Sequence, residues 1–328
     1  MADIARFAGV STATVSRALS NSPLVNEATR QRILELARSV QYTVNVSAQS
    51  LRLGENNTVA VVLPYSAQSR QNLSDPFFLG IIGCIANSLT ERGLEMLLSR
   101  VDENELESFA RLHATGRARG IIVIGQWHHH DQLNELAVGR LPFVVWGAQM
   151  PGQLYCTVGS DNVAGGHAAT AHLLAAGRRR IAFLGDTSLP EVAQRYDGYL
   201  QAHREAGVEP DPQLQVPVPF LAEGARDMIV ALCAGRRPFD AVFAASDLLA
   251  MTAISVLVGR GRKVPRDVAV VGYDDVELSR HFHPPLTTVR QPLDEAGERL
   301  VEMVLRLSQS ERVPSCLLST ALVLRESA

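Results

Sequence analysis

The residues Asp3 to Leu19, with the sequence DIARFAGVSTATVSRAL, constrain the fold more than any other part of the chain. Gly9 stands near the middle, where a tight turn would bring a larger side chain into a clash. Ser11 is placed to cap a helix that runs from Thr12 to about Leu19. The segment before Gly9 has its apolar residues on one helical face: Ile4, Ala5 and Ala8. We therefore expect two short helices joined by a glycine turn.

Two such helices are too small to bury a core, so the next residues must complete it. Asn26 is placed to cap a third helix. Small residues such as Ala5 let two helix backbones approach where they cross steeply, as in a helix-turn-helix. The apolar residues expected to form a small core are Ile33, Leu36, Ala37 and Val40 of the third helix with Val10, Val15 and Leu19. This pattern predicts a three-helix DNA-binding head, and its alternative is an ordinary helical hairpin docked on a larger domain.

The charge distribution favours the DNA-binding interpretation. Residues 1–54 contain six arginines and three acids, a net charge of +6 − 3 = +3, so a chain of net charge −3 leaves −3 − 3 = −6 for residues 55–328. A basic terminal segment is typical of a nucleic-acid contact, although solvated helix faces also produce one.

The remaining residues alternate between strand-like and helix-like segments. Short apolar strands that alternate with helices predict parallel sheets buried on both faces. The expected strands are 59–63, 95–99, 120–125, 142–147, 180–185, 241–245 and 268–273, with amphipathic helices over 78–92, 164–176 and 248–258. A length of 328 residues suits two such units plus the small head.

Composition excludes several classes of protein. No apolar run approaches the roughly 20 residues that cross a bilayer, and no signal peptide is recognisable, so we expect a soluble cytoplasmic protein. The four cysteines lack metal-binding or disulfide spacing and are expected to be reduced and buried: Cys84, Cys156, Cys233 and Cys316. Three adjacent histidines at 128–130 cannot converge on one metal ion without strain, which favours a solvated loop.

Enzyme motifs are missing from the sequence. There is no phosphate-binding loop, no nucleophile elbow and no zinc-binding His-Glu-x-x-His helix. We predict that the protein is not an enzyme and uses no cofactor or metal. A rival class is a solute-binding protein, but that class does not contain a helix-turn-helix.

Ligands of parallel sheets bind beyond the carboxyl ends of the strands, here between two subdomains. Asp247 follows a predicted strand and Arg195 lies in the helix after another, so the pair could hold vicinal hydroxyls. An Asp247 to Arg195 salt bridge without a ligand is the alternative. Five aromatic residues have matching positions and offer flat surfaces to a sugar ring: Phe77, Phe78, Trp127, Trp146 and Phe220. For Phe77 core packing is an equal alternative, and Trp127 could simply be exposed.

The chain resembles the lactose-repressor and galactose-repressor (LacI/GalR) family of bacterial transcription regulators. The resemblance begins with DIARFAGVSTATVSRALSNSPLVNEATRQRI and YTVNVSAQSL, and covers nearly the whole chain. It continues through SDPFFLGIIGCIANSLTERG, VGSDNVAGGHAATAHLLAAGRRRIAFLG, AVFAASDLLAM and VAVVGYDDVELSRHFHPPLTTVRQP. Two features depart from the family: the chain begins a few residues late, and Val44 replaces the usual proline.

The resemblance implies an α/β fold with a helix-turn-helix head (1–44), a hinge helix (45–56) and a body (57–328). The body would contain two doubly wound parallel-sheet subdomains of periplasmic-binding-protein type joined by three crossovers, near Thr157, at 287–290 and near Ser315. The expected boundaries are 57–157 with 290–314 for the N-subdomain, and 158–287 with 315–328 for the C-subdomain. The segment SCLLSTALVLR would be the closing strand.

The resemblance also implies the DNA contacts of the head and hinge. Thr12 and Ala13 would point into the major groove, and Arg17 would grip a guanine edge or only position the backbone. Leu51 would be an apolar wedge that kinks the duplex from the minor groove, rather than a plain linker residue. The full implied set is Ser11, Thr12, Ala13, Thr14, Ser16, Arg17, Asn21, Asn45, Ala48 and Leu51.

In the body, the resemblance assigns Arg195 and Asp247 to the effector. Further effector candidates are Gln149, Asp161, Asn162 and Asp274. Asp274 and Asp275 could instead build a turn or a dimer surface. The chain ends soon after its last predicted strand without a leucine heptad extension, so the expected assembly is a homodimer.

The expected function is repression of sugar or glycoside utilisation genes, with operator DNA and a small sugar as binding partners. A purine-type regulator armed by its ligand is the alternative within the same family.

Overall fold

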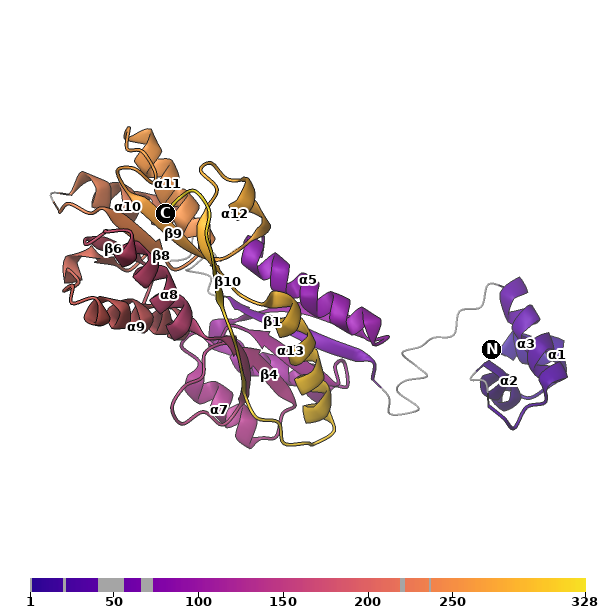
Figure 1. The fold of residues 1–328 in the computed structure, drawn as a ribbon. Coiled ribbons are helices and arrows are strands. Elements are labelled where there is room, and N and C mark those ends of the chain that lie inside the picture. Colours follow the sequence, from indigo (N-terminus) through magenta and orange to yellow (C-terminus); the bar gives the residue numbers. More distant parts are fainter. Residues whose placement is uncertain (1, 20–21, 41–55, 66–72, 219–221, 236) are drawn as a thin grey trace. The chain divides into compact units, whose positions relative to one another are not determined.

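The computed structural model describes residues 2–19, 22–40, 56–65, 73–218, 222–235 and 237–328 (Figure 1). The chain divides into two compact units, the head (Met1–Asn56) and the body (Asn57–Ala328), which are described separately. No described helix is both long and apolar enough to cross a membrane.

The head contains three helices, α1 (Ala2–Ala8), α2 (Thr12–Leu19) and α3 (Glu27–Ser39). Gly9 has φ +65°, the left-handed conformation that the turn between α1 and α2 requires. The side chain of Asn26 caps α3 by accepting a hydrogen bond from the Thr29 N–H at 2.8 Å. The three helices and their caps confirm the expected helix-turn-helix.

The head core is small and apolar. Its buried members are Ile4, Ala5, Ala8, Val15, Ala18, Val25, Ile33 and Ala37, with Val10, Leu19 and Leu36 packed beside them. The prediction was wrong for Val40, which is the C-cap of α3 and is 49% exposed. The helix ends before Val40, so this residue leaves the face that the periodicity assigned to it.

The first sheet of the body is parallel throughout, with strand order β11-β5-β4-β3-β1-β2. Its strands are β1 (Thr58–Tyr65), β2 (Glu95–Asp102), β3 (Gly120–Ile124), β4 (Phe143–Trp146), β5 (Cys156–Ser160) and β11 (Cys316–Leu318). Helices α5 (Pro76–Glu91) and α13 (Leu293–Ser308) pack together on one face, and Figure 1 shows them side by side. The other face is covered by η1 (Glu103–Phe109), α6 (Ala110–Ala114) and α7 (His130–Val138).

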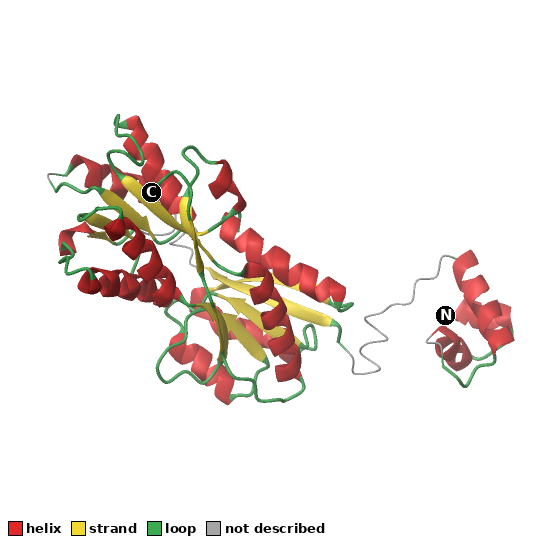
Figure 2. Ribbon diagram, in the orientation of Figure 1, coloured by secondary structure: helices red, strands yellow, loops and turns green. Residues whose placement is uncertain are grey.

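The second sheet has the order β12-β10-β9-β8-β6-β7, and β12 is antiparallel to β10. Its strands are β6 (Ile181–Leu184), β7 (Gln215–Val216), β8 (Ala241–Ala244), β9 (Ala269–Asp274), β10 (Thr287–Arg290) and β12 (Ala321–Val323). Helices α8 (Asn162–Ala175) and α9 (Pro190–Glu205) cover one face. Helices α10 (Ala222–Ala234) and α11 (Asp247–Gly259) cover the other, as Figure 2 shows. Two shorter helices are η2 (Pro212–Leu214) and α12 (Glu277–His281).

Both sheets are therefore buried on two faces, and residues along β1 alternate between the two cores. Val59 and Val61 face α5 and α13, whereas Ala60 and Val62 face the opposite layer. This two-sided burial explains the nearly continuous apolar strands of the sequence.

Three crossovers join the two sheets, and each is a short link that directly follows a strand: β5, β10 or β11. The segment expected as one closing strand is two strands, β11 in the first sheet and β12 in the second. β5 continues in the first sheet to Ser160, past the boundary expected at residue 157. β11 pairs with β5, so the first sheet also contains residues beyond the boundary expected at residue 314. β10 lies wholly in the second sheet, although residue 290 was expected to open the N-subdomain segment. Tertiary pairing sets these ends, and periodicity does not report it.

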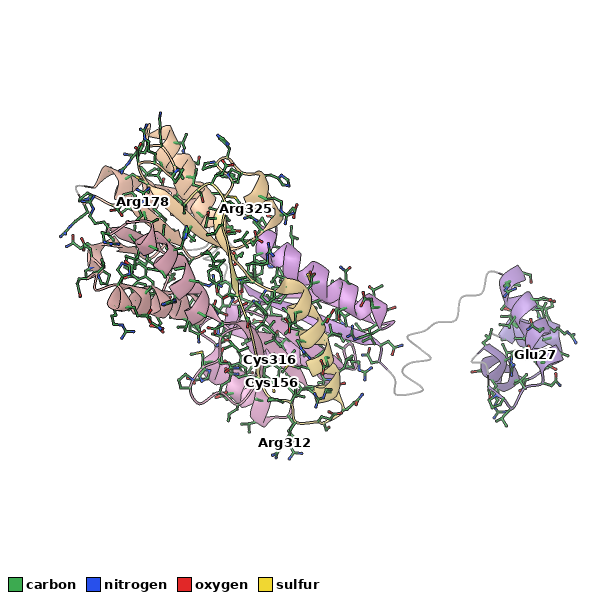
Figure 3. All side chains as sticks on the ribbon, in the orientation of Figure 1. Glu27, Cys156, Arg178, Arg312, Cys316 and Arg325 are labelled. Atoms are coloured by element: carbon green, nitrogen blue, oxygen red, sulfur yellow. The ribbon has the colours of Figure 1, made fainter. Side chains whose placement is uncertain are left out.

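The four cysteines are free, as expected, but they are half-buried rather than buried. Cys156 and Cys316 begin the neighbouring strands β5 and β11, and Figure 3 shows them close together in the N-subdomain. The Cys156 thiol donates a hydrogen bond to the Val313 carbonyl at 2.7 Å.

Two glycines let α8 and α9 cross at very short range. A Cβ on Gly166 would lie 2.1 Å from the Arg195 carbonyl oxygen, and one on Gly198 would lie 2.1 Å from the Val163 carbonyl oxygen. Real Cβ atoms are essentially never this close to backbone atoms. The contact therefore fixes the position of α9 on α8.

We expect Gly198→Ala to lower the free energy of unfolding of the body by about 1–3 kcal/mol, since backbone atoms cannot move away from the added methyl. Urea denaturation of the purified chain measures this change. The control is Gly259→Ala at the end of α11, where an added Cβ meets nothing within 4 Å. Equal unfolding midpoints for the two variants would contradict the close crossing.

Candidate functional site

The first candidate site is the exposed face of α2 in the head. Thr12, Ala13 and Arg17 are exposed, whereas Val15 and Ala18 of the same helix are buried in the head core. Thr14 and Ser16 are half-buried between these two faces. The burial pattern leaves the beginning of α2 open to a groove of DNA.

Ser11 holds the start of this helix. Its Oγ accepts a hydrogen bond from the Thr14 N–H at 3.1 Å and lies 2.9 Å from the Thr14 hydroxyl. The loop between α2 and α3 is anchored by Arg30, whose guanidinium donates to the Ser22 and Val25 carbonyls. These bonds fix the angle at which α2 projects from the head.

Several expected contacts lie outside the described residues. They are Asn21, the hinge residues Asn45, Ala48 and Leu51, and the aromatic Phe220. Their roles remain predictions.

The second candidate site lies where the strands of the two sheets end, and Arg195 is at its centre. Arg195 is 6% exposed and its Nε donates to Asn162 Oδ1 at 2.9 Å. One terminal nitrogen donates to the Ala245 carbonyl, and the guanidinium stacks on the Tyr273 ring at 3.8 Å. Three fixed partners hold the guanidinium plane in one orientation.

Asp247 is held by hydrogen bonds inside the C-subdomain, and the effector contact expected of it stays a prediction. Its side chain is fully buried, and its two oxygens accept hydrogen bonds from the Thr288 hydroxyl and the Val276 N–H. No ion pair joins it to Arg195 among the described residues. Burial, followed by the charge of Asp274, raises the pKa of Asp247 well above its usual range. Asp247 thus ties β10 and the loop after β9 to the start of α11.

Asp274 is a second buried acid at this site. It ends β9 with φ +118°, and its carboxylate accepts from Gln291 Nε2 at 2.7 Å and from the Asp247 N–H. Burial raises its pKa to about 7, although Arg195 acts in the opposite direction.

The neighbouring Asp275 forms ion pairs with Arg290 and Arg325. These ion pairs lower the pKa of Asp275, although burial acts in the opposite direction. Figure 3 marks Arg325 in this subdomain. Asp275 therefore stabilises the turn after β9, which was one of the two alternatives given for it from the sequence.

Asp75 was missed by the sequence analysis. It caps α5 of the N-subdomain by accepting from the Phe77 N–H at 2.9 Å, and its charge raises the pKa of Asp274 in the C-subdomain. Burial raises the pKa of Asp75 as well. The signal in the sequence is an Asp-Pro pair at a predicted helix start, which marks a cap but not a partner on the other sheet.

The aromatic candidates fall into two groups. Phe77, Phe78 and Trp146 form one cluster, with ring centroids 5.6 Å apart for the phenylalanines and 6.3 Å apart for Phe77 and Trp146. Trp146 is buried and Phe77 packs on the first core, so these rings contribute to packing. Trp127 is half-buried with φ +45°, and its indole lies against Gly125.

The remaining candidates are structural caps or edges of the site. Asp161 caps α8 by accepting from the Ala164 N–H, and buried Asn162 orients both Arg195 and the Tyr273 hydroxyl. Gln149 is exposed, and its carbonyl accepts from Gln194 Nε2 at 3.0 Å.

Gln126 and Glu191 were also missed, although both lie beside this site. Glu191 lies in the first turn of α9, four residues before Arg195, and Gln126 lies two residues after the end of β3. A carboxylate one helical turn from Arg195 was the signal that could have identified Glu191.

Of the three histidines expected in a solvated loop, His128 is exposed, whereas His129 and His130 are half-buried and His130 begins α7. His129 Nδ1 contacts Gln132 Oε1 at 2.8 Å, and His130 Nδ1 contacts the Tyr155 hydroxyl at 3.0 Å. A hollow of about 730 Å³ lies elsewhere, beside α9 and residues 207–210.

Comparisons with known proteins agree with this architecture. Residues 1–45 match the family described as bacterial regulatory proteins, lacI family, and residues 170–328 match a periplasmic binding protein-like domain. The chain is similar to the HTH-type transcriptional regulator CelR of Thermobifida fusca, with 33% identity over 99% of this chain and 96% of the relative.

Solved structures give the same result. A structure described as a transcriptional regulator CelR–cellobiose complex has a TM-score of 0.74 and 31% identity, covering 99% of this chain and 98% of that chain. The Lac repressor dimer bound to operator and the anti-inducer ONPF has a TM-score of 0.86 and 25% identity, covering 99% and 97%.

The raised pKa of Asp274 predicts a pH-dependent stability. Between its ordinary value of 3.8 and about 7, the folded body binds a proton that the unfolded chain releases, so stability falls as the pH rises through this range. In Asp274→Asn, the part of this pH-dependent loss of stability that comes from Asp274 is absent. Thermal unfolding of the body at pH 5 and pH 8 measures the difference, with exposed Asp227→Asn on α10 as the control. The same pH dependence in Asp274→Asn and wild type would refute this assignment.

Proposed function

Because the chain belongs to the lacI family of bacterial regulatory proteins, we propose that it is a homodimeric transcriptional repressor of genes for the use of a sugar or glycoside. It binds operator DNA through its head, and a small sugar bound between the subdomains of the body controls the affinity. It acts by binding rather than by catalysis, in the cytoplasm, where the DNA is accessible.

The observation that supports this proposal most directly is the exposed face of α2. A helix-turn-helix places the start of its second helix in the major groove, and Thr12, Ala13 and Arg17 are the exposed residues there. Arg17 offers a bidentate contact to guanine, whereas Ala13 offers an apolar contact to a thymine methyl. In this proposal Leu51 of the hinge wedges open a central base step.

The polar groups around Arg195 support a neutral polyhydroxylated effector. Arg195 and Asp274 place a donor and an acceptor at the strand ends, and Asp75 adds an acceptor from the other subdomain. Trp127 offers a half-buried ring of the kind that packs on a pyranose. The similar structure described as a CelR–cellobiose complex favours a saccharide of this size.

Control follows from linkage between the two sites. If the effector and the operator bind different arrangements of the subdomains, each weakens the other by the same coupling free energy, typically about 1–3 kcal/mol. A ligand that stabilises the DNA-binding arrangement would reverse the sign of this coupling free energy and increase the affinity for the operator.

We expect Arg17→Ala to weaken binding to the specific operator by about 1–3 kcal/mol and to relax the choice of base, because a bidentate contact is lost. The operator is first selected from random duplexes with the wild-type chain, and affinities are then compared by competition. The control is Arg32→Ala, an exposed arginine of α3. An unchanged base preference in Arg17→Ala would show that Arg17 does not contact the bases.

A thermal-shift screen with mono- and disaccharides, including cellobiose, tests the effector. A ligand at 100 times its dissociation constant adds about 2.7 kcal/mol to the stability of the folded body. Arg195→Gln should lower the affinity for the saccharide found by one to two decades, since it removes charge-assisted hydrogen bonds worth about 1.5–3 kcal/mol. Exposed Arg204→Gln on the same helix is the matched control. Equal affinities in calorimetry for both variants would make Arg195 purely structural.

A further inference from the structure

The first turn of α9, in the C-subdomain, contacts the loop after β4, in the N-subdomain. The Glu191 carboxylate accepts a hydrogen bond from the Ala148 N–H. One helical turn later, Gln194 Nε2 donates to the Gln149 carbonyl at 3.0 Å. Residues three apart face the same side of a helix, so α9 holds the loop with two side chains at once. Both bonds run from one subdomain to the other, so they oppose separation of the subdomains at this edge.

Gly147 makes the contact sterically feasible. A Cβ at this position would lie 2.1 Å from Gln126 Oε1 and 3.3 Å from Glu191 Oε1. Two side-chain oxygens from different subdomains therefore approach the same backbone atom. Any side chain at position 147 would force at least one of them away.

Gln126 is fully buried and only half-satisfied. Its Nε2 donates to the Tyr155 hydroxyl at 3.3 Å, but within the described ranges no group donates to its Oε1. A buried acceptor without a donor is unfavourable, because it has lost its hydrogen bonds to water and gained none in the protein. A protonated Glu191, which approaches the same Gly147 carbon, would supply the missing donor as an O–H group.

The charges around Glu191 decide how readily it accepts a proton. Burial raises its pKa, whereas Arg195 on the same helix and the Ala148 N–H act in the opposite direction. The facing titratable group of the N-subdomain is the Tyr155 phenol, which His130 of α7 contacts in turn. The effect of burial is the largest of these, so the contact favours the neutral acid.

We propose that Glu191 is a proton-dependent latch between the two subdomains. With its carboxyl protonated, Glu191 donates to Gln126 Oε1 and accepts from the Ala148 N–H, and the subdomains are held together at this edge. When the carboxyl ionises, the facing oxygens repel and the first turn of α9 separates from the loop. The latch shifts the balance between subdomain arrangements independently of any ligand.

The direction of the pH effect follows from linkage. The latched state has the higher Glu191 pKa, since separation returns the carboxyl to water, and it therefore binds more protons than the open state. Acidification favours the latch, and the latch is lost as the pH rises through the pKa of the latched form.

The two tryptophans of the chain report on this contact directly, because Trp127 follows Gln126 and Trp146 precedes Gly147. Tryptophan fluorescence of the full-length chain, without DNA or ligand, is recorded from pH 8 to pH 4.5. We expect one reversible transition in the wild type with a midpoint above the ordinary range of an exposed glutamate. Glu191→Gln abolishes the transition and keeps the low-pH signal at all pH values, since its amide donates permanently.

Glu191→Ala also abolishes the transition but keeps the high-pH signal, because it removes both bonds. Gly147→Ala gives the same open signal with Glu191 intact, and circular dichroism checks that it remains folded. The control variant Glu205→Gln, an exposed glutamate at the end of the same helix, retains the wild-type transition. A flat wild-type titration, an unchanged midpoint in Glu191→Gln, or identical signals from Glu191→Gln and Glu191→Ala would overturn the latch. No operator or effector enters the measurement, so either result leaves the proposed regulatory function to its own tests.

Discussion

The close crossing of α8 and α9 is the contact on which the site around Arg195 depends. Gly166 and Gly198 bring the two helix backbones together, and this positions Asn162 on one helix against Arg195 on the other. The same placement of α9 directs Glu191 towards the N-subdomain. A single backbone approach therefore sets the orientation of the central guanidinium and the reach of the inter-subdomain contact.

The second physical constraint is the cost of burying carboxyl groups together. Asp247 and Asp274 lie in one small region, and burial raises the pKa of each. Asp247 has both oxygens satisfied inside the C-subdomain, whereas Asp274 depends on Gln291 and a helix N-terminus. A region with acceptors in excess of donors suits a ligand that brings hydroxyl groups. This chemistry agrees with the saccharide effector proposed for the cleft.

Sequence reasoning predicted the elements more reliably than the partners of individual side chains. The helix-turn-helix was readable because Gly9, Ser11 and Asn26 each have a local mechanism, a turn or a cap. Asp247 was assigned to a ligand because a carboxylate follows a strand, but the hydrogen bonds that occupy it come from residues 29 and 41 positions away. Glu191 was missed for the same reason, because Ala148, whose N–H donates to its carboxylate, is distant in sequence and lies in the other subdomain.

The sequence by itself determined the local features: the three helices of the head, the apolar strands buried on two faces, and the exposed residues of α2. These depend on periodicity and capping, which involve neighbours only a few positions apart. Only the tertiary structure decided that the last segment divides into β11 and β12 in different sheets, and that Asp75 acts on Asp274. Strand pairing and the burial of charge depend on residues distant in sequence, so no local pattern records them.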